Sequence, residues 1–376
     1  MKVSNRPSML LVWHEAGNPL YADRFHALAA HFDLTVYGFS EFQGVEFPVE
    51  KDGGTGEGGF VLELFEPVLS RHWLTVFSLP LVRAARRGQF DIVYIHEEPH
   101  SLLAMLLSAA CRNSRIFVDA AVINRRLNFG QMNLCEGYVY KRAEALFYRN
   151  DDVRDVLIAR GCPRDKLMRR LGNGVSKRTF HDLGAIARQS LSCFPIDSKY
   201  VVGYAGRIWK WKGVSILGKI AQMPGVSVVA CGPVWDEDLA EELVEQGVVL
   251  YPKLGKSELV AFYSAIDLFI LPSIPSPNWT EQFGRVVVES VFCGSPAIGS
   301  SAGFIPELVG REQVFNALNH DEAIALVDRM RDSSHRKQVL LDQQNRLGGE
   351  YSWEGIASLV HSLIGSGAVS SLGARL

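Results

Sequence analysis

The stretch Val201–Leu217, V-V-G-Y-A-G-R-I-W-K-W-K-G-V-S-I-L, places a cationic loop between a predicted strand and a predicted helix. Its first residues are apolar, as in a buried strand, and the helix is expected to begin near Gly213. Gly206 lets the backbone approach a ligand closely, because glycine has no Cβ atom. Arg207 and Lys212 add two positive charges beside the expected helix N-terminus. Together these features predict a diphosphate site. Such a loop taken alone is more often a solvated basic surface, and the second stretch described below changes that balance.

This strand opens a series of short apolar segments that alternate with helical patterns. Further strands of the series are expected at residues 226–230, 248–251, 268–271 and 296–299. An earlier series has expected strands at 9–13, 34–39, 91–95, 116–118 and 145–148, with helices at 23–31, 78–87 and 101–111. Such alternation is typical of parallel sheets covered on both faces. The prediction is an α/β protein with two doubly wound Rossmann-like domains that face each other across a ligand-binding cleft.

The two series also set the expected domain boundaries. Residues 1–178 would form the N-terminal domain and residues 179–351 the C-terminal domain. A linker is expected near residues 176–198, where Pro195 and weak periodicity interrupt the pattern. The small and polar tail at 365–376 is expected to fray.

Composition limits the class of protein. The chain has 376 residues, 47% apolar and 21% charged, and a net charge of -2, which gives no argument for nucleic-acid binding. Its six cysteines form no C-x-x-C pair, which argues against a zinc ribbon and suits a reducing cytosol. The first residues are polar and unlike a signal sequence, and no long apolar run predicts a transmembrane helix.

The stretch His96–His100, H-E-E-P-H, matches the zinc-protease pattern His-Glu-x-x-His. That chemistry needs both histidines on one face of a helix. Here an apolar strand precedes His96, and Pro99 belongs at a helix start because it lacks an N–H group. We therefore expect His96 at the end of a strand and His100 in the first turn of the next helix. The connection between this strand and this helix would open on the cleft.

Two other stretches match known motifs but do not indicate the functions usually associated with them. Residues 54–59, G-T-G-E-G-G, fit the dinucleotide fingerprint, but they do not follow a strand or open a helix, so a loop is expected. Residues 278–280, N-W-T, fit a glycosylation acceptor, which has no meaning in a cytosolic protein.

A second informative stretch runs from Pro272 to Ser300 and contains E-Q-F-G-R-V-V-V-E at residues 281–289. A helix is expected from Gly284, so Glu281 precedes it and Glu289 lies inside it. The N–H groups of residues 283–285 would then be unpaired at a second helix N-terminus. Carboxylates beside a diphosphate repel it unless they bind hydroxyl groups. The combination therefore points to a ligand with both phosphates and sugar hydroxyls.

These motifs resemble glycosyltransferase family 4, which has the GT-B fold. The resemblance is carried by the two glutamates separated by seven residues, by G-S-P-A-I-G-S and G-F-I-P-E-L-V after them, and by G-Y-A-G-R with K-G in the first stretch. It covers residues 200–310 well and the N-terminal half more weakly. It implies a retaining, hexosyltransferase-type enzyme that uses a nucleotide sugar of the UDP or GDP type, without a metal or a further cofactor.

The resemblance also implies roles for residues of the C-terminal half. Arg207 and Lys212 would hold the donor diphosphate and stabilise the leaving nucleotide, which makes them catalytic together with Glu281. Glu281 would contact hydroxyls of the donor sugar, and Glu289 those of the ribose. The remaining donor-binding residues would be Gly206, Leu254, Gly255, Phe283, Gly284 and Arg285, with Leu254 and Gly255 near the base.

The N-terminal domain would bind the acceptor. Gly17 resembles the glycine of a family loop after the first strand, and His96 opens on the same expected cleft. Many family members carry a histidine where this chain has Asp119. Asp119 would either occupy that position in the cleft or cap a following turn. The last helix, near residues 352–366, resembles the closing helix of the family and is expected to pack back on the N-terminal domain.

Many relatives assemble lipid-linked glycans, so a glycan or lipid-linked acceptor and a role in cell-surface polysaccharide or glycoconjugate synthesis are expected. The protein would be cytoplasmic and could be peripheral at the inner membrane face, through the basic segments 72–87 and 160–178. A core helix and a solvated positive face are the alternative for these segments, and Pro80 interrupts the first one. Other functions considered are a nucleotide-sugar epimerase of GT-B-like architecture and a catalytically silent partner protein that binds a sugar nucleotide.

Overall fold

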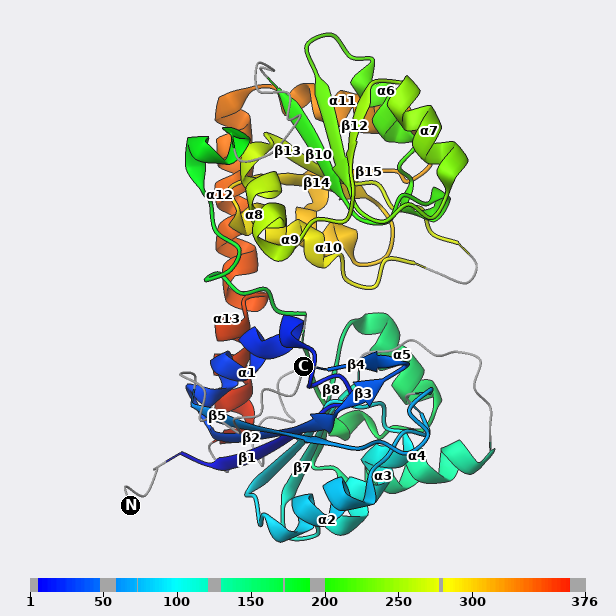
Figure 1. Cartoon of the computed structure of the whole chain (residues 1–376), viewed down its shortest axis with the longest axis vertical. Coiled ribbons are helices and arrows are strands. Elements are labelled where there is room, and N and C mark those ends of the chain that lie inside the picture. Colours follow the sequence, from blue (N-terminus) through cyan, green and yellow to red (C-terminus); the bar gives the residue numbers. More distant parts are fainter. Residues whose placement is uncertain are drawn as a thin grey trace. The chain divides into compact units, whose positions relative to one another are not determined.

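The structure is a computed structural model that describes residues 6–47, 59–72, 74–120, 130–171, 173–189, 200–276 and 280–365. The chain divides into two compact units (Figure 1). Unit 1 contains Met1–Gly172 together with Trp353–Leu376, and unit 2 contains Asn173–Ser352. The predicted features at 54–58, 190–198, 278–279 and 366–376 lie outside the described residues.

Unit 1 is built on a seven-stranded parallel sheet in the order β5-β2-β1-β6-β7-β8-β9. The strands are β1 (Ser8–Val12), β2 (Asp33–Phe39), β5 (Phe60–Phe65), β6 (Ile92–Ile95), β7 (Arg115–Ala120), β8 (Ala145–Tyr148) and β9 (Leu167–Arg170), and a small hairpin is formed by β3 (Glu41–Phe42) and β4 (Val45–Glu46). The helices are α1 (Ala22–Ala29), α2 (Leu79–Arg87), α3 (Leu102–Ala110), α4 (Gly130–Arg142), α5 (Asp151–Ala159) and α13 (Trp353–Val360), which continues as a π-helix (His361–Gly365).

The side chains of the central strands alternate between two cores, one on each face of this sheet. Leu10 and Val12 of β1 join the core formed with α2, α3, α4 and α5. Met9 and Leu11 join the opposite core, which contains residues of α1 and α13. Burial on both faces explains why the central strands are continuously apolar.

Unit 2 repeats this architecture with a six-stranded parallel sheet in the order β12-β11-β10-β13-β14-β15. Its strands are β10 (Val201–Ala205), β11 (Ser227–Cys231), β12 (Val248–Tyr251), β13 (Leu268–Leu271), β14 (Ala297–Ser300) and β15 (Val314–Phe315). Its helices are α6 (Ile216–Ala221), α7 (Glu237–Glu245), α8 (Lys256–Ala265), α9 (Arg285–Phe292), α10 (Ile305–Val309), α11 (His320–Arg329) and α12 (Ser333–Glu350).

These observations confirm the predicted α/β class with two doubly wound, Rossmann-like units. All ten of the expected strands lie within one or two residues of the observed ones, because each is a local run of apolar residues. No strand was expected from the sequence between β2 and α2. The structure has β5 there, at the edge of the sheet and only partly buried, so its apolar pattern was weak.

Three smaller predictions need correction. Pro80 does not interrupt a helix but lies in the first turn of α2, where Ser78 is the N-cap. His100 is not in the first helical turn, because Ser101 is the N-cap of α3 and accepts a hydrogen bond from the backbone N–H of Ala104. The start of the expected linker is packed rather than loose, since Phe180 lies in the hydrophobic core of unit 2.

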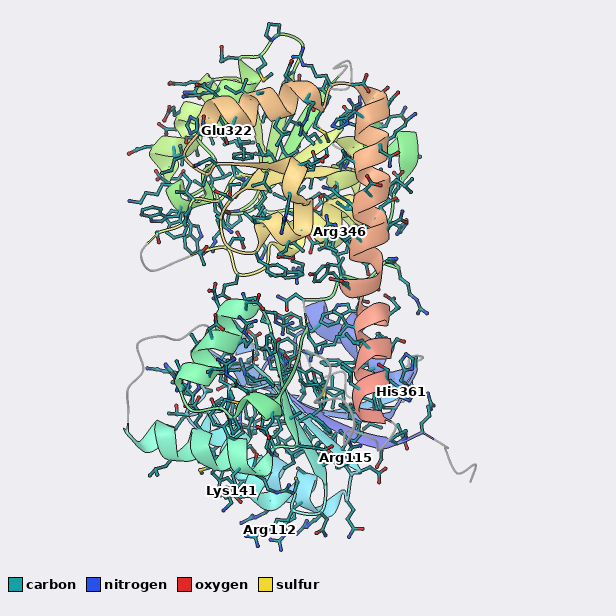
Figure 2. The ribbon with its side chains drawn as sticks, turned by 180° about the vertical axis from the view of Figure 1, so that it is seen from behind. Arg112, Arg115, Lys141, Glu322, Arg346 and His361 are labelled. Atoms are coloured by element: carbon teal, nitrogen blue, oxygen red, sulfur yellow. The ribbon has the colours of Figure 1, made fainter. Side chains whose placement is uncertain are left out.

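Side-chain contacts hold the ends of the last two long helical segments, α12 in unit 2 and α13 with its π-helix in unit 1 (Figure 2). In unit 1, Arg115 of β7 donates to the backbone oxygen of Ile364 at 2.8 Å, and His361 stacks on His31 with ring centroids 5.1 Å apart. In unit 2, Arg346 of α12 donates to the oxygen of Leu308 at 2.7 Å. None of the helices in the described ranges combines the length and the apolar character needed to cross a bilayer.

Candidate functional site

The predicted donor residues lie where the strand order of unit 2 changes direction. The chain winds from β10 to β11 and β12 on one side, and β13, β14 and β15 lie on the other. Ligands of such sheets bind beyond the carboxyl ends of the strands at this switch point. The loops after β10 and β13 carry Arg207, Lys212 and Glu281, so the fold places three predicted residues at the expected location.

The loop after β10 is shaped by glycines. The N–H of Gly206 donates to the oxygen of Cys231 at 2.9 Å, and a Cβ at Gly206 would lie 2.6 Å from the hydroxyl of Tyr204. Gly213 has a φ of 68°, and a Cβ there would lie 1.9 Å from the oxygen of Pro272. Gly213 therefore allows the loop after β10 to touch the loop after β13.

The helix after this loop differs from the prediction. Residues Lys210–Lys212 form a 3-10 turn, and α6 begins at Ile216 rather than near Gly213. It has six residues. The two cationic side chains, rather than the dipole of this short helix, therefore carry the argument for a diphosphate.

Lys212 and Glu281 form an ion pair although they are 69 positions apart in the sequence. The Nζ atom of Lys212 lies 2.6 Å from Oε2 of Glu281, and the two side chains are 11% and 13% exposed. The hydroxyl of Ser273 donates to the same carboxylate oxygen at 2.9 Å. The backbone oxygen of Glu281 accepts from the N–H of Phe304 at 3.0 Å. A Cβ at Gly303 would lie 2.0 Å from that oxygen, so only glycine fits there.

The second glutamate is buried in α9. Glu289 accepts a hydrogen bond from the hydroxyl of Tyr263 at 2.9 Å. Its other oxygen lies 2.8 Å from Nε of Arg285, one helical turn earlier. Its side chain is 2% exposed, whereas that of Arg285 is 49% exposed. The buried carboxylate of Glu289 is thus paired with an arginine whose side chain reaches the protein surface.

The residues before α9 form its N-terminus, as expected. Gly284 is the N-cap with a left-handed backbone, φ 81°. Phe283 is buried and stacks on Phe304 with ring centroids 5.6 Å apart. After β12, the N–H of Gly255 is bound by the side chain of Glu258 at 2.8 Å, and Leu254 packs on the core. Leu254 and Gly255 therefore follow the edge strand of the sheet, because β12 lies one strand beyond β11.

Arg207 is held by aromatic rings instead of a carboxylate. Its guanidinium carbon lies 4.3 Å from the ring centroid of Trp235 and 5.4 Å from that of Trp209. In the part of unit 2 that the structure describes, no carboxylate is within ion-pair distance of this arginine. The two predicted cations are therefore positioned by different means.

In unit 1, Asp119 lies at the end of β7 in a buried charge cluster. Its carboxylate is 2.8 Å from Nδ1 of His96 and 3.0 Å from Arg24. The hydroxyl of Tyr94 donates to it at 3.1 Å, and Arg149 lies 3.5 Å away. Burial alone would raise the pKa of Asp119, but Arg149, His96 and Arg24 outweigh it and hold the pKa well below its usual range. Burial, followed by Arg24, lowers the pKa of His96 to about 3.

A second pair in unit 1 was not predicted from the sequence. His14, just after β1, has Nδ1 at 2.8 Å from both carboxylate oxygens of Glu97, which follows β6. Burial lowers the pKa of His14, but Glu97 reverses this effect and leaves the pKa raised. Strands β1 and β6 flank the switch point of this sheet. The available signal was that His14 directly follows one of these two predicted strands and that Glu97 lies two positions after the other.

The other acceptor-side predictions have structural explanations. Gly17 is buried, and a Cβ there would lie 2.8 Å from Phe47, so close packing accounts for this glycine. His96 directly follows β6 and contacts Asp119, whereas His100 precedes α3 and lies 3.9 Å from Glu136. The two histidines of H-E-E-P-H are therefore not arranged as in a zinc protease.

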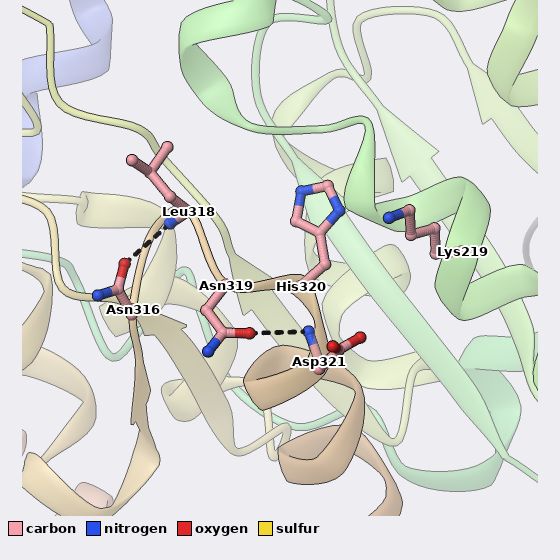
Figure 3. Close-up of a pocket in the computed structure, with 6 residues that line it drawn as sticks. All are labelled: Lys219, Asn316, Leu318, Asn319, His320 and Asp321. Carbon is pink, nitrogen blue, oxygen red and sulfur yellow. Dashed lines mark hydrogen bonds between the residues drawn. The ribbon is translucent and has the colours of Figure 1, made fainter.

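An open cavity of about 560 Å³ lies elsewhere in unit 2, near the N-terminus of α11 (Figure 3). The side chain of Asn319 caps this helix, with Oδ1 at 3.1 Å from the N–H of Asp321. The cavity contains none of the predicted site residues, and is lined by Lys219, Asn316, Leu318, Asn319, His320 and Asp321.

Comparison with known proteins finds a family that is similar to unit 2. Residues 194–346 match the family described as glycosyl transferases group 1. Most of unit 2 is therefore similar to the glycosyl transferases of group 1. The matched region contains all the predicted catalytic and donor-binding residues, which lie in the loops after β10, β12 and β13 and in α9.

Curated relatives match this chain over part of its length and part of their own. D-inositol 3-phosphate glycosyltransferase of Mycobacterium marinum is 30% identical over 187 residues, which is 45% of this chain and 38% of the relative. The protein of the same name from Mycolicibacterium smegmatis is 32% identical over 147 residues, 36% of this chain and 32% of the relative. The matches thus span about a third of those relatives.

Solved structures match both units. HepE of Anabaena in complex with UDP has a TM-score of 0.73 at 17% identity, covering 96% of this chain and all of that one. Sucrose-phosphate synthase of Thermosynechococcus elongatus has a TM-score of 0.67 at 17% identity, covering 95% and 98%. At this identity the likeness concerns the fold alone, and it agrees with the GT-B fold expected from the sequence.

Proposed function

We propose that the protein is a glycosyltransferase of family 4 that transfers a hexose, with retention, from a nucleotide sugar. The observation that carries this proposal is the Lys212–Glu281 pair beside Arg207, at the switch point of a unit similar to the glycosyl transferases of group 1. A leaving diphosphate gains negative charge as its bond to the sugar breaks. Cations fixed at this position stabilise the transition state more than the ground state.

Lys212 and Glu281 would change partners when the donor binds. Lys212 is held by a carboxylate before the donor binds, so its charge is already at the site and needs little reorganisation. A bound diphosphate would compete with Glu281 for the ammonium group and release the carboxylate toward hydroxyls of the donor sugar. The N–H groups near Phe283, Gly284 and Arg285 would assist. Glu289 would bind the ribose, and Gly206, Leu254 and Gly255 would line the remaining donor site.

On the acceptor side, we propose that Asp119 positions His96. A carboxylate on Nδ1 leaves Nε2 as the ring atom that would face an acceptor hydroxyl. Because the pKa of His96 is lowered to about 3, the ring is neutral near pH 7 and would orient the hydroxyl rather than hold its proton. The proton would pass to the leaving phosphate, and Gly17 would shape the neighbouring loop.

The donor is proposed to be of the UDP or GDP type, with no metal and no other cofactor. HepE has been crystallised with UDP and with UDP-glucose, which favours testing uridine nucleotides first. The acceptor would be a glycan or a lipid-linked glycan of cell-surface polysaccharide or glycoconjugate synthesis. A cytoplasmic protein could meet such an acceptor at the inner membrane face through exposed Arg83, Arg86 and Arg87 of α2. Flotation with anionic vesicles tests that contact.

The decisive experiment is acceptor-dependent release of nucleotide from UDP-glucose, GDP-mannose and related sugars. Release that depends on acceptor supports transfer, whereas isomerisation of the sugar without release supports the epimerase. Binding without either reaction supports a silent partner protein. Lys212→Ala should lose activity, and Lys210→Ala is its matched control, because Lys210 lies exposed in the same loop.

A further inference from the structure

Two tryptophans from the loops after β10 and β11 lie next to the guanidinium of Arg207. The indole centroids of Trp209 and Trp235 lie 5.7 Å apart, with an angle of 56° between the rings. The guanidinium carbon is within 5.4 Å of both centroids. This distance is inside the range in which a cation is attracted to an aromatic face.

The backbone builds this arrangement. Ile208 and Val234 form a parallel bridge. The N–H of Ile208 donates to the oxygen of Pro233 at 3.0 Å, and the N–H of Trp235 donates to the oxygen of Ile208 at 3.0 Å. In an extended segment successive side chains point to opposite sides. Ile208 is buried, so Arg207 and Trp209 share the other side, where Trp235 meets them.

Stacking holds an arginine differently from an ion pair. A carboxylate would occupy the N–H groups at the edge of the guanidinium, whereas an aromatic ring contacts its face. The five N–H donors remain in the plane of the group, where they match the oxygens of a phosphate. Lys212, by contrast, donates to Glu281 within the same site.

We propose that Trp209 and Trp235 are positioning residues that hold Arg207 ready for the diphosphate of the donor. They restrict the side chain before the ligand arrives, which reduces the conformational entropy lost on binding. This inference rests on the proposed function, because it assumes that Arg207 binds a diphosphate. The other role open to an exposed indole is stacking on the nucleobase of the donor.

The test compares Trp235→Leu with Trp235→Phe, which differ in the aromatic face but are both apolar. Trp235 is 58% exposed, so both variants should fold with unchanged thermal stability. Calorimetry would measure binding of inorganic pyrophosphate and of UDP. We expect Trp235→Leu to weaken both ligands by about 3- to 10-fold, and Trp235→Phe to remain within about 2-fold of the original protein.

Each outcome has one meaning. Equal affinity of all three proteins for pyrophosphate overturns the positioning role, and a loss confined to UDP assigns Trp235 to the base instead. In an Arg207→Ala background, Trp235→Leu should change pyrophosphate binding by less than about 1.5-fold, since the group that it positions is absent. A full effect there would also contradict the inference. If the original protein binds neither pyrophosphate nor any nucleoside diphosphate, the proposed function itself fails.

Discussion

The ion pair of Lys212 and Glu281 predicts a measurable coupling between the two residues. The perturbations are Lys212→Met, Glu281→Gln and their combination. The two charged atoms lie 2.6 Å apart, and the side chains are 11% and 13% exposed. This places the pair between a surface ion pair, which contributes about 0.2–1 kcal/mol, and a fully buried one, whose disruption costs about 3–5 kcal/mol.

We therefore expect Lys212→Met to lower the free energy of unfolding of unit 2 by about 1–3 kcal/mol. The Glu281 carboxylate would retain the hydroxyl of Ser273 but lose the ammonium group that balances its charge. Glu281→Gln removes that charge. The loss of unfolding free energy in the double variant should accordingly be smaller than the sum of the two single losses by at least about 1 kcal/mol.

Hydrogen exchange of the β10 and β13 amides, measured in the absence of nucleotide, reports the stability of unit 2 separately from unit 1. Turnover of a nucleotide sugar is the second readout, and Lys212→Met should lower it about 100-fold or more. Stability effects that add within about 0.5 kcal/mol would refute the coupling. Unchanged turnover would refute the assignment of Lys212 to the phosphate.

Three further predictions concern single positions. Asp119→Asn should destabilise unit 1 by about 3–5 kcal/mol in urea unfolding near pH 7, because it leaves buried arginines without their countercharge; a loss below 1 kcal/mol would contradict this. The raised pKa of His14 predicts a stabilising contribution that is complete below pH 6.5 and is lost as the pH rises through the folded pKa; Glu97→Gln should lower this pKa in an NMR titration, and an unchanged pKa would exclude the ion pair. Gly213→Ala should cost about 1–3 kcal/mol in unit 2 and weaken UDP binding, because φ is 68° and a Cβ would meet Pro272; full stability in thermal unfolding would show that the loop contact is dispensable.

The order of strands and helices could be predicted well from the sequence, because each strand is a local apolar run and each helix has a local period. β12, for example, was predicted at its observed bounds, Val248–Tyr251. The edge strand β5 was missed because an edge strand is half exposed, and its alternation is hard to separate from a loop. The start of α6 was placed too early because a 3-10 turn has no distinct sequence signal.

For the candidate site too, some features could be predicted from the sequence and others required the tertiary structure. By itself, the sequence determined the fold class and indicated candidate donor residues, because glycine turns, cations and the spaced glutamates lie in two short stretches. Only the tertiary structure decided their partners, such as Lys212 with Glu281 and His14 with Glu97, which are 69 and 83 positions apart. The reason is that parallel strands bring distant loops together at the switch point of a sheet, and no local pattern encodes which side chains meet there.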